Sequence, residues 1–201
     1  MRTILAAVAA ILLAMGPANA HSFNVALLVG QSGPAASDGD QIRDGFLLAT
    51  RERDAHPDQE SDGHLGGLDV YLFLIDDRYS PLAGVLTLLE QRTIDILAII
   101  GPDVLVETIR PRTAGLQAIL LVQGQMAFPA SSAASDAIET PAVRAFIEAF
   151  KAEFGYLPAH SAGQGYNAAR RIDAAVRAQG GVSDKTALQQ ALRQSESGFD
   201  W

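Results

Sequence analysis

The chain has 201 residues, of which 48% are hydrophobic, and this length suits one domain with a real core rather than two ordinary ones. It contains no cysteine, which excludes disulfide bonds, a thiolate nucleophile and cysteine metal ligands. Its formal net charge of −8 argues against nucleic acid or anionic lipid as a partner, because binding either one requires concentrated lysine and arginine.

The first 20 residues have the pattern of a secretory signal peptide. Arg2 precedes an apolar run over residues 4–15, and residues 18–20 (Ala-Asn-Ala) supply the small residues of a signal-peptidase site. The apolar run is shorter than the roughly 20 residues needed to span a bilayer, which disfavours the alternative of a membrane anchor. We therefore expect cleavage before His21 and a mature protein in the periplasm.

Strand and helix patterns alternate through the next hundred residues. Near-continuous apolar runs predict buried strands over residues 23–30, 69–75, 93–100 and 118–123. Helical spacing predicts helices over residues 39–54, 81–91 and 104–116, the last kinked or broken at Pro111. A turn-rich segment (31–38) and a polar loop (55–68) lie between the first elements. This alternation predicts a parallel sheet covered by helices on both faces.

The pattern changes after residue 123. Residues 124–139 form an alanine- and serine-rich joint, and only helical patterns follow it, over residues 140–154, 161–179 and 183–194. Thr140 and Pro141 predict the start of the first of these helices, Gly155 predicts its end, and Ser183 is expected to cap the third.

Several segments together resemble the type 1 periplasmic solute-binding proteins, the ABC-importer receptors for leucine, isoleucine, valine and related solutes. The opening VALLVGQSGPAASDGDQIRDGFLLA is similar to that family's first strand, Ser-Gly-Pro turn and first helix. GGLDVYLFLIDD and DILAIIGP resemble two later strands. The most specific segment is TPAVRAFIEAFKAEFGYLPAHSAGQGYNAARR, which resembles a late helix ending in Tyr/Phe-Gly-x-x-Pro and the Gly-Tyr-(Asp/Asn)-Ala-Ala helix after it. The resemblance covers residues 23–123 and 140–200.

The resemblance implies two α/β lobes that are joined by hinge strands and close on a ligand. The joint of this chain has only 16 residues, whereas a single βαβ unit needs about 30. We therefore expect one Rossmann-like α/β lobe over residues 21–201, with a parallel sheet of about four or five strands. In this interpretation the joint replaces the second lobe, and the C-terminal helices pack on the first.

Open α/β sheets bind ligands beyond the carboxyl ends of their strands. The residues expected at that edge are Ser32, Gly33, Asp77, Gly101, Pro102, Asp103, Leu105, Gln123 and Gln125. The resemblance implies hydroxyl groups for a ligand carboxylate after the third and fourth strands, and this chain keeps almost none of them there. Asp103 places a negative charge where the family receives a carboxylate, which disfavours tight binding of an amino acid.

A second candidate site is an acidic loop with calcium-loop spacing. Asp58, Glu60, Asp62 and Asp69 occupy positions 1, 3, 5 and 12, with Gly63 at position 6. The alternative is a solvated acidic loop between a helix and a strand. No other cofactor is expected.

The remaining polar residues favour structural roles over catalysis. Asp76 and Asp77 are read as turn and capping residues rather than a catalytic pair, and Ser32 lacks the setting of a nucleophile. Three histidines are read as loop residues and two adjacent arginines as a solvated helix face; these are His56, His64, His160, Arg170 and Arg171. Nothing in the sequence indicates an enzyme.

The sequence therefore predicts a non-enzymatic binding or accessory protein that acts through a protein partner or a homodimer. Loss of a lobe is expected to expose apolar side chains of the cleft face to that partner, namely Val104, Leu105, Met126 and Phe128. An ABC permease is a further expected partner. Two alternatives stay open: a small-solute receptor of an ABC importer, and a calcium-stabilised periplasmic accessory protein.

Overall fold

The computed structural model describes residues 21–54, 60–76, 86, 87, 89, 91, 93–100, 111, 118–122 and 140–195. The expected signal peptide (1–20) and joint (124–139), and most of the expected helices over 81–91 and 104–116, lie outside the described residues. In the part of the chain that is described, no helix has the length and apolar character needed to cross a bilayer.

The sheet has five strands in the order β2-β3-β1-β4-β5. Four of them are the expected strands, namely β1 (Ser22–Val29), β3 (Leu68–Asp76), β4 (Ile96–Ile100) and β5 (Ala118–Val122). These four pair in parallel, with Val25 of β1 opposite Leu72 of β3 and Ile96 of β4. The α/β class and the parallel sheet predicted from the apolar runs are confirmed.

The prediction of a polar loop over residues 55–68 is wrong at the C-terminal end of that range. His64–Leu65 forms the short strand β2, which pairs antiparallel with Leu68 and Asp69 of β3. Gly66 and Gly67 connect the two strands with φ values of 65° and 83°. Two successive residues at positive φ give the type of tight turn whose twist matches that of a hairpin, and Gly-Gly is one of its sequence signals.

The helix expected over residues 39–54 is displaced by three residues. The short 3₁₀ helix η1 (Gly33–Ala35), with Pro34 inside it, leads directly into α2 (Ala36–Arg51). Proline is well suited to the first turn of a helix, because its φ is already helical and its missing N–H is not needed there. The helical structure therefore starts earlier than the apolar spacing alone indicates.

The three C-terminal helices are confirmed as α5 (Pro141–Phe154), α6 (His160–Gln179) and α7 (Lys185–Gln194). The Thr140 hydroxyl accepts a hydrogen bond from the Val143 N–H at 3.2 Å, and Gly155 ends α5 in the left-handed conformation at φ 79°. The cap expected at Ser183 is wrong, because the Asp184 carboxylate accepts the bond from the Ala187 N–H at 2.9 Å.

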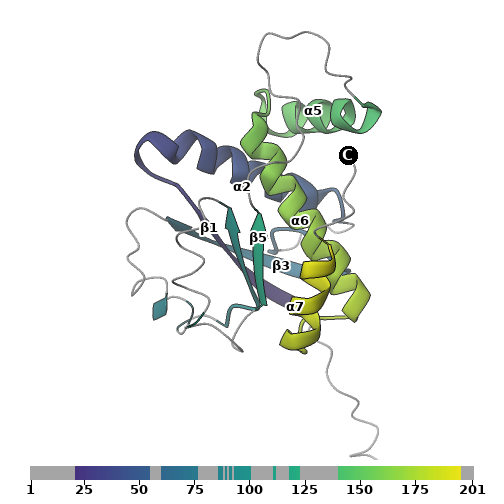
Figure 1. The fold of residues 1–201 in the computed structure, drawn as a ribbon. Coiled ribbons are helices and arrows are strands. Elements are labelled where there is room, and N and C mark those ends of the chain that lie inside the picture. Colours follow the sequence, from purple (N-terminus) through teal and green to yellow (C-terminus); the bar gives the residue numbers. More distant parts are fainter. Residues whose placement is uncertain are drawn as a thin grey trace, which may run out of the picture.

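Apolar side chains cover both faces of the sheet. Val25, Leu27 and Val29 of β1 join the larger core with residues of α2, α5, α6 and α7. Ala26 and Leu28 point to the other face, in a smaller cluster that includes Leu89. Figure 1 shows α6 crossing α2 on the side of the larger core, with α7 following it. The alternation along β1 thus produces a sheet buried between two layers.

One polar stripe of α2 holds the segment that joins α5 to α6. The segment runs antiparallel to the helix, and its four polar contacts are Glu153 with Arg51, Tyr156 with Asp44, Ala159 with Gln41, and Ser161 with Asp38. The α2 residues recur at helical spacing, so they lie along one side of the helix. The C-terminal helices are therefore fixed on α2 by specific bonds as well as by apolar contact.

Candidate functional site at the carboxyl edge of the sheet

The strand order fixes where a ligand would meet this fold. From β1 the chain passes to β3 on one side, and then to β4 on the other side of β1. The order therefore reverses at β1, and in open α/β sheets ligands bind at such a reversal, beyond the carboxyl ends of the strands. Because β3, β1, β4 and β5 are parallel, Asp76, Val29, Ile100 and Val122 end at the same edge.

The turn after β1 is held in a fixed shape. Gly33 has φ 64°, a conformation that favours glycine. Gly39 of α2 lies against the end of β1 so closely that an added Cβ would fall 1.8 Å from the Gly30 carbonyl oxygen. The helix backbone therefore packs directly on the strand end, and only glycine permits this approach. Ser32 and Gly33 follow the end of β1 and so lie at this edge, and their role in ligand binding stays a prediction.

Two polar groups mark this edge. The Gln31 N–H donates a hydrogen bond of 3.2 Å to the Asp76 Oδ1, which links the ends of β1 and β3. The Ser32 Oγ is buried and has no hydrogen-bond partner in the described structure. Buried hydroxyls are nearly always hydrogen-bonded in native proteins. The Ser32 hydroxyl is therefore a candidate ligand contact within the described part of this edge.

The other residues expected at this edge are Asp77, Gly101, Pro102, Asp103, Leu105, Gln123 and Gln125, and they lie outside the described residues. The same holds for the expected apolar contacts Val104, Met126 and Phe128. The strands that precede them end side by side, with Ile100 paired to Val122. Their place in a binding site stays a prediction.

Asp69, one acidic residue of the expected calcium loop, lies far from this edge, near the start of β3. Asp69 and Asp76 are seven residues apart on one strand, which corresponds to about 23 Å. Asp58 lies outside the described residues, Glu60 is exposed, and the Asp62 carboxylate accepts a hydrogen bond of 2.7 Å from the Leu72 N–H. The described residues hold no group of three histidine, aspartate or glutamate side chains arranged for a metal ion. Calcium binding stays a prediction.

Sequence reasoning missed a cluster around His64. Its Nδ1 lies 3.0 Å from the Asp54 Oδ1, and its Nε2 lies 2.9 Å from the Asp69 Oδ1. The three side chains are at most 27% exposed. The cluster links the end of α2 to the hairpin of β2 and β3. The sequence carried no signal for it, because β2 itself was not expected.

Arg171 is also placed differently from the prediction of a solvated face. It is 8% exposed, and its Nε donates to the Ser195 Oγ at 3.1 Å while its Nη2 donates to the Leu192 carbonyl at 3.3 Å. The guanidinium therefore binds the C-terminal end of α7, where carbonyl groups lack helical partners. A second arginine, Arg170, lies over the ring of Tyr166.

No protein-family model and no curated protein matches the sequence. Solved structures, by contrast, do match the fold of this chain. An ABC transporter substrate-binding protein from Sphaerobacter thermophilus is similar with a TM-score of 0.58 and 16% identity, over 85% of this chain and 85% of that one. A solute-binding protein of an ABC transporter from R. palustris, solved in complex with benzoate, gives the same four values. The resemblance to type 1 periplasmic binding proteins predicted from the motifs is confirmed at the level of the fold.

Proposed function

We propose that this chain is a non-enzymatic periplasmic binding or accessory protein, built as one lobe of the solute-binding fold, that binds at the carboxyl edge of its sheet. The observation that carries the proposal is the buried Ser32 Oγ, which has no hydrogen-bond partner among the described residues and lies where open α/β sheets bind ligands. The similar proteins of known structure are solute-binding proteins of ABC transporters, which supports binding rather than catalysis.

In the leading form of the proposal, the ligand is a protein. In a two-lobed binding protein the second lobe closes over this edge. A chain that builds only the first lobe would leave the edge open to a protein partner, such as a permease, or to a second copy of itself. Apolar residues expected there, such as Leu105 and Met126, would supply the contact area.

The second form is a small-solute receptor, which the Ser32 hydroxyl favours because a single polar group suits a small carboxylate better than a broad protein surface. The R. palustris protein binds benzoate in its crystal structure. Benzoate and leucine are therefore the two solutes to test first. A lobe without its counterpart buries less of a small ligand, so we expect weak binding.

A thermal-shift series on the protein beginning at His21 tests these forms, with leucine, benzoate and calcium chloride as separate additions and Ser32→Ala as the matched variant. A stabilisation by leucine or benzoate that disappears in Ser32→Ala supports the small-solute form. A shift that Ser32→Ala leaves unchanged overturns binding at this edge. A shift with calcium alone supports the calcium-stabilised alternative instead.

The protein-partner form is tested by sedimentation and by site-specific cross-linking. A dimer that Ser32→Arg disrupts supports binding to a second copy at this edge. A photo-cross-linking side chain at position 32, used in intact cells, should form an adduct that the same side chain at Arg193 does not. Absence of a solute shift, of a dimer and of this adduct would overturn the proposed function.

A further inference from the structure

Among the described residues, no strand pairs with the outer edge of β3 beyond Leu72. The sheet order places β3 next to β2 alone on this side, and β2 pairs only with Leu68 and Asp69. Asp62 and Gly63 exchange two backbone hydrogen bonds with Val70, and the Asp62 carboxylate takes the N–H of Leu72. The first half of the edge is therefore covered.

The second half exposes backbone groups. Residues of a parallel strand bond alternately to one side and to the other. The Asp69 N–H bonds to the His21 carbonyl on the side of β1, so Leu74 directs its N–H and C=O away from β1. Neither group has a hydrogen-bond partner in the described part of the chain. Such groups on an edge strand are a template for another strand.

The side chains around this open stretch are apolar on both faces. Tyr71 is 36% exposed and Leu74 is 37% exposed, and they belong to opposite faces of the strand. Natural edge strands are usually protected by lysine, proline or a bulge, none of which occurs between residues 70 and 76. An added strand would cover both side chains and would form hydrogen bonds with the backbone N–H and C=O of Leu74.

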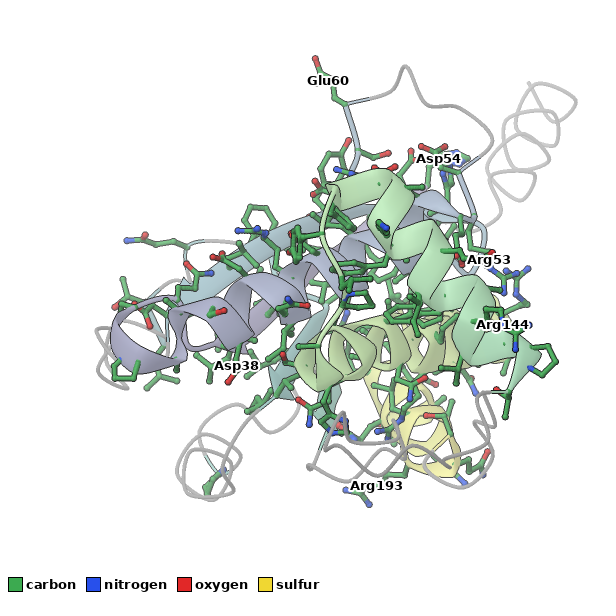
Figure 2. The ribbon with its side chains drawn as sticks, turned by 90° about the horizontal axis from the view of Figure 1, so that it is seen from above. Asp38, Arg53, Asp54, Glu60, Arg144 and Arg193 are labelled. Carbon is green, nitrogen blue, oxygen red and sulfur yellow. The ribbon has the colours of Figure 1, made fainter. Side chains whose placement is uncertain are left out.

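The negative charge near the open stretch favours an added strand that carries positive charge. Residues 60–76 contain four carboxylates and no lysine or arginine. Two of them border the open stretch, because Asp62 bonds to the Leu72 N–H and Asp76 ends the strand, whereas Asp69 belongs to the covered half. Glu60 projects away from the body of the protein (Figure 2). Opposite charges stabilise neighbouring strands and like charges destabilise them. A second copy of β3 would bring acidic surface against acidic surface, whereas a basic strand would be attracted.

We propose that the edge of β3 from Leu72 to Asp76 docks an extended segment of a partner protein in which adjacent apolar residues, one for each face, are flanked by lysine or arginine. The segment adds a strand to the sheet beyond β3. Main-chain bonds to Leu74 give affinity, Tyr71 and Leu74 accept apolar side chains on either face, and the acidic surface sets the preference for cationic ones. This site lies on the outer edge of the sheet and does not depend on a ligand after β1.

The probe is a six-residue peptide in which two adjacent valines are flanked on each side by two arginines, titrated into the protein beginning at His21 and followed by backbone amide NMR. We expect shifts confined to β3 and slower hydrogen exchange of the Leu74 amide on binding. Leu74→Lys, which places a cation on the edge, should weaken binding at least tenfold. Leu157→Lys is the matched control, because Leu157 is 64% exposed between α5 and α6, outside the sheet, and should have no effect.

Two peptide variants keep the proposal falsifiable whatever the stability of Leu74→Lys. A peptide with glutamate in place of arginine should bind at least tenfold more weakly, and so should one with proline opposite Leu74, which removes a main-chain donor. Equal binding of all three peptides, or shifts outside β3, would overturn the proposal. So would protection of the Leu74 amide that rises with protein concentration alone, since this would identify a second copy as the occupant.

Discussion

The phenol hydroxyl of Tyr156 donates a hydrogen bond to the carboxylate of Asp44, which is 5% exposed in the middle of α2. The Nε of Arg43 donates to the other oxygen of that carboxylate at 2.7 Å. A buried charge is tolerated when donors surround it, and here one of the two donors comes from the turn between α5 and α6. The Asp44 carboxylate therefore receives its full set of hydrogen bonds only when the C-terminal helices dock on α2.

Replacement of Tyr156 by phenylalanine should destabilise the protein by about 1 to 3 kcal/mol, because it leaves a buried carboxylate short of one donor. Urea denaturation at pH 7 measures this loss. The variant keeps the ring, which packs edge to face on Phe150 with ring centroids 5.2 Å apart, so the change reports the hydroxyl. An unchanged midpoint would show that water replaces the phenol at Asp44.

The same pair predicts a response to alkaline pH. Burial, together with the hydrogen bond to Asp44, raises the pKa of Tyr156 above its ordinary value of about 10. Because the folded state holds this proton more tightly, the stabilisation is complete below about pH 10 and is lost as pH rises above it. Stability measured from pH 8 to 11 should fall less steeply in Tyr156→Phe than in the parent. Parallel curves would contradict this role for Tyr156.

The crossing of α2 and α6 depends on two glycines. A Cβ at Gly45 would lie 1.9 Å from the Ala162 carbonyl oxygen, and one at Gly165 would lie 1.9 Å from the Ile42 carbonyl oxygen. Alanine normally stabilises a helix interior by about 1 kcal/mol relative to glycine. Here we expect the opposite sign for Gly45→Ala and Gly165→Ala, a loss of roughly 1 to 3 kcal/mol each, because the backbones must move apart. Thermal unfolding measures the sign, and a stabilised variant would contradict the crossing.

The sequence predicted those features of the fold that depend on local pattern. Buried runs such as β4 and caps such as Thr140 follow from neighbouring residues alone. The segment from Glu153 to Ser161 is held on α2 by contacts between residues about 100 or more positions apart in the sequence. No local pattern encodes such contacts. For the candidate site, the family resemblance predicted Ser32 at the edge. The burial of its hydroxyl without a partner among the described residues depends on three-dimensional packing, which no local pattern encodes.

The stability of the protein should depend more on Arg171, which is buried in α6, than on Arg193, which is exposed in α7. Replacing it by methionine keeps most of the packed stem but removes the donors to Ser195 and to the Leu192 carbonyl, so we expect a loss of about 1 to 3 kcal/mol. Arg193 is exposed (Figure 2), and Arg193→Met should change stability by less than about 0.5 kcal/mol. Urea denaturation of the two variants makes the comparison. Equal losses of stability in the two variants would contradict the buried role of Arg171 and would support the solvated face predicted from the sequence.

The start of α7 separates two adjacent residues that both suit a helix cap. Asp184 accepts the hydrogen bond from the Ala187 N–H, whereas Ser183 is exposed one position earlier. Aspartate at this position also places a negative charge at the positive end of the helix dipole. Asp184→Ala should therefore cost about 0.5 to 2 kcal/mol, and Ser183→Ala should be close to neutral. Hydrogen exchange of the Ala187 amide gives a local readout, because only Asp184→Ala should speed it. Faster exchange in Ser183→Ala instead would move the cap to the residue that the sequence pattern favoured.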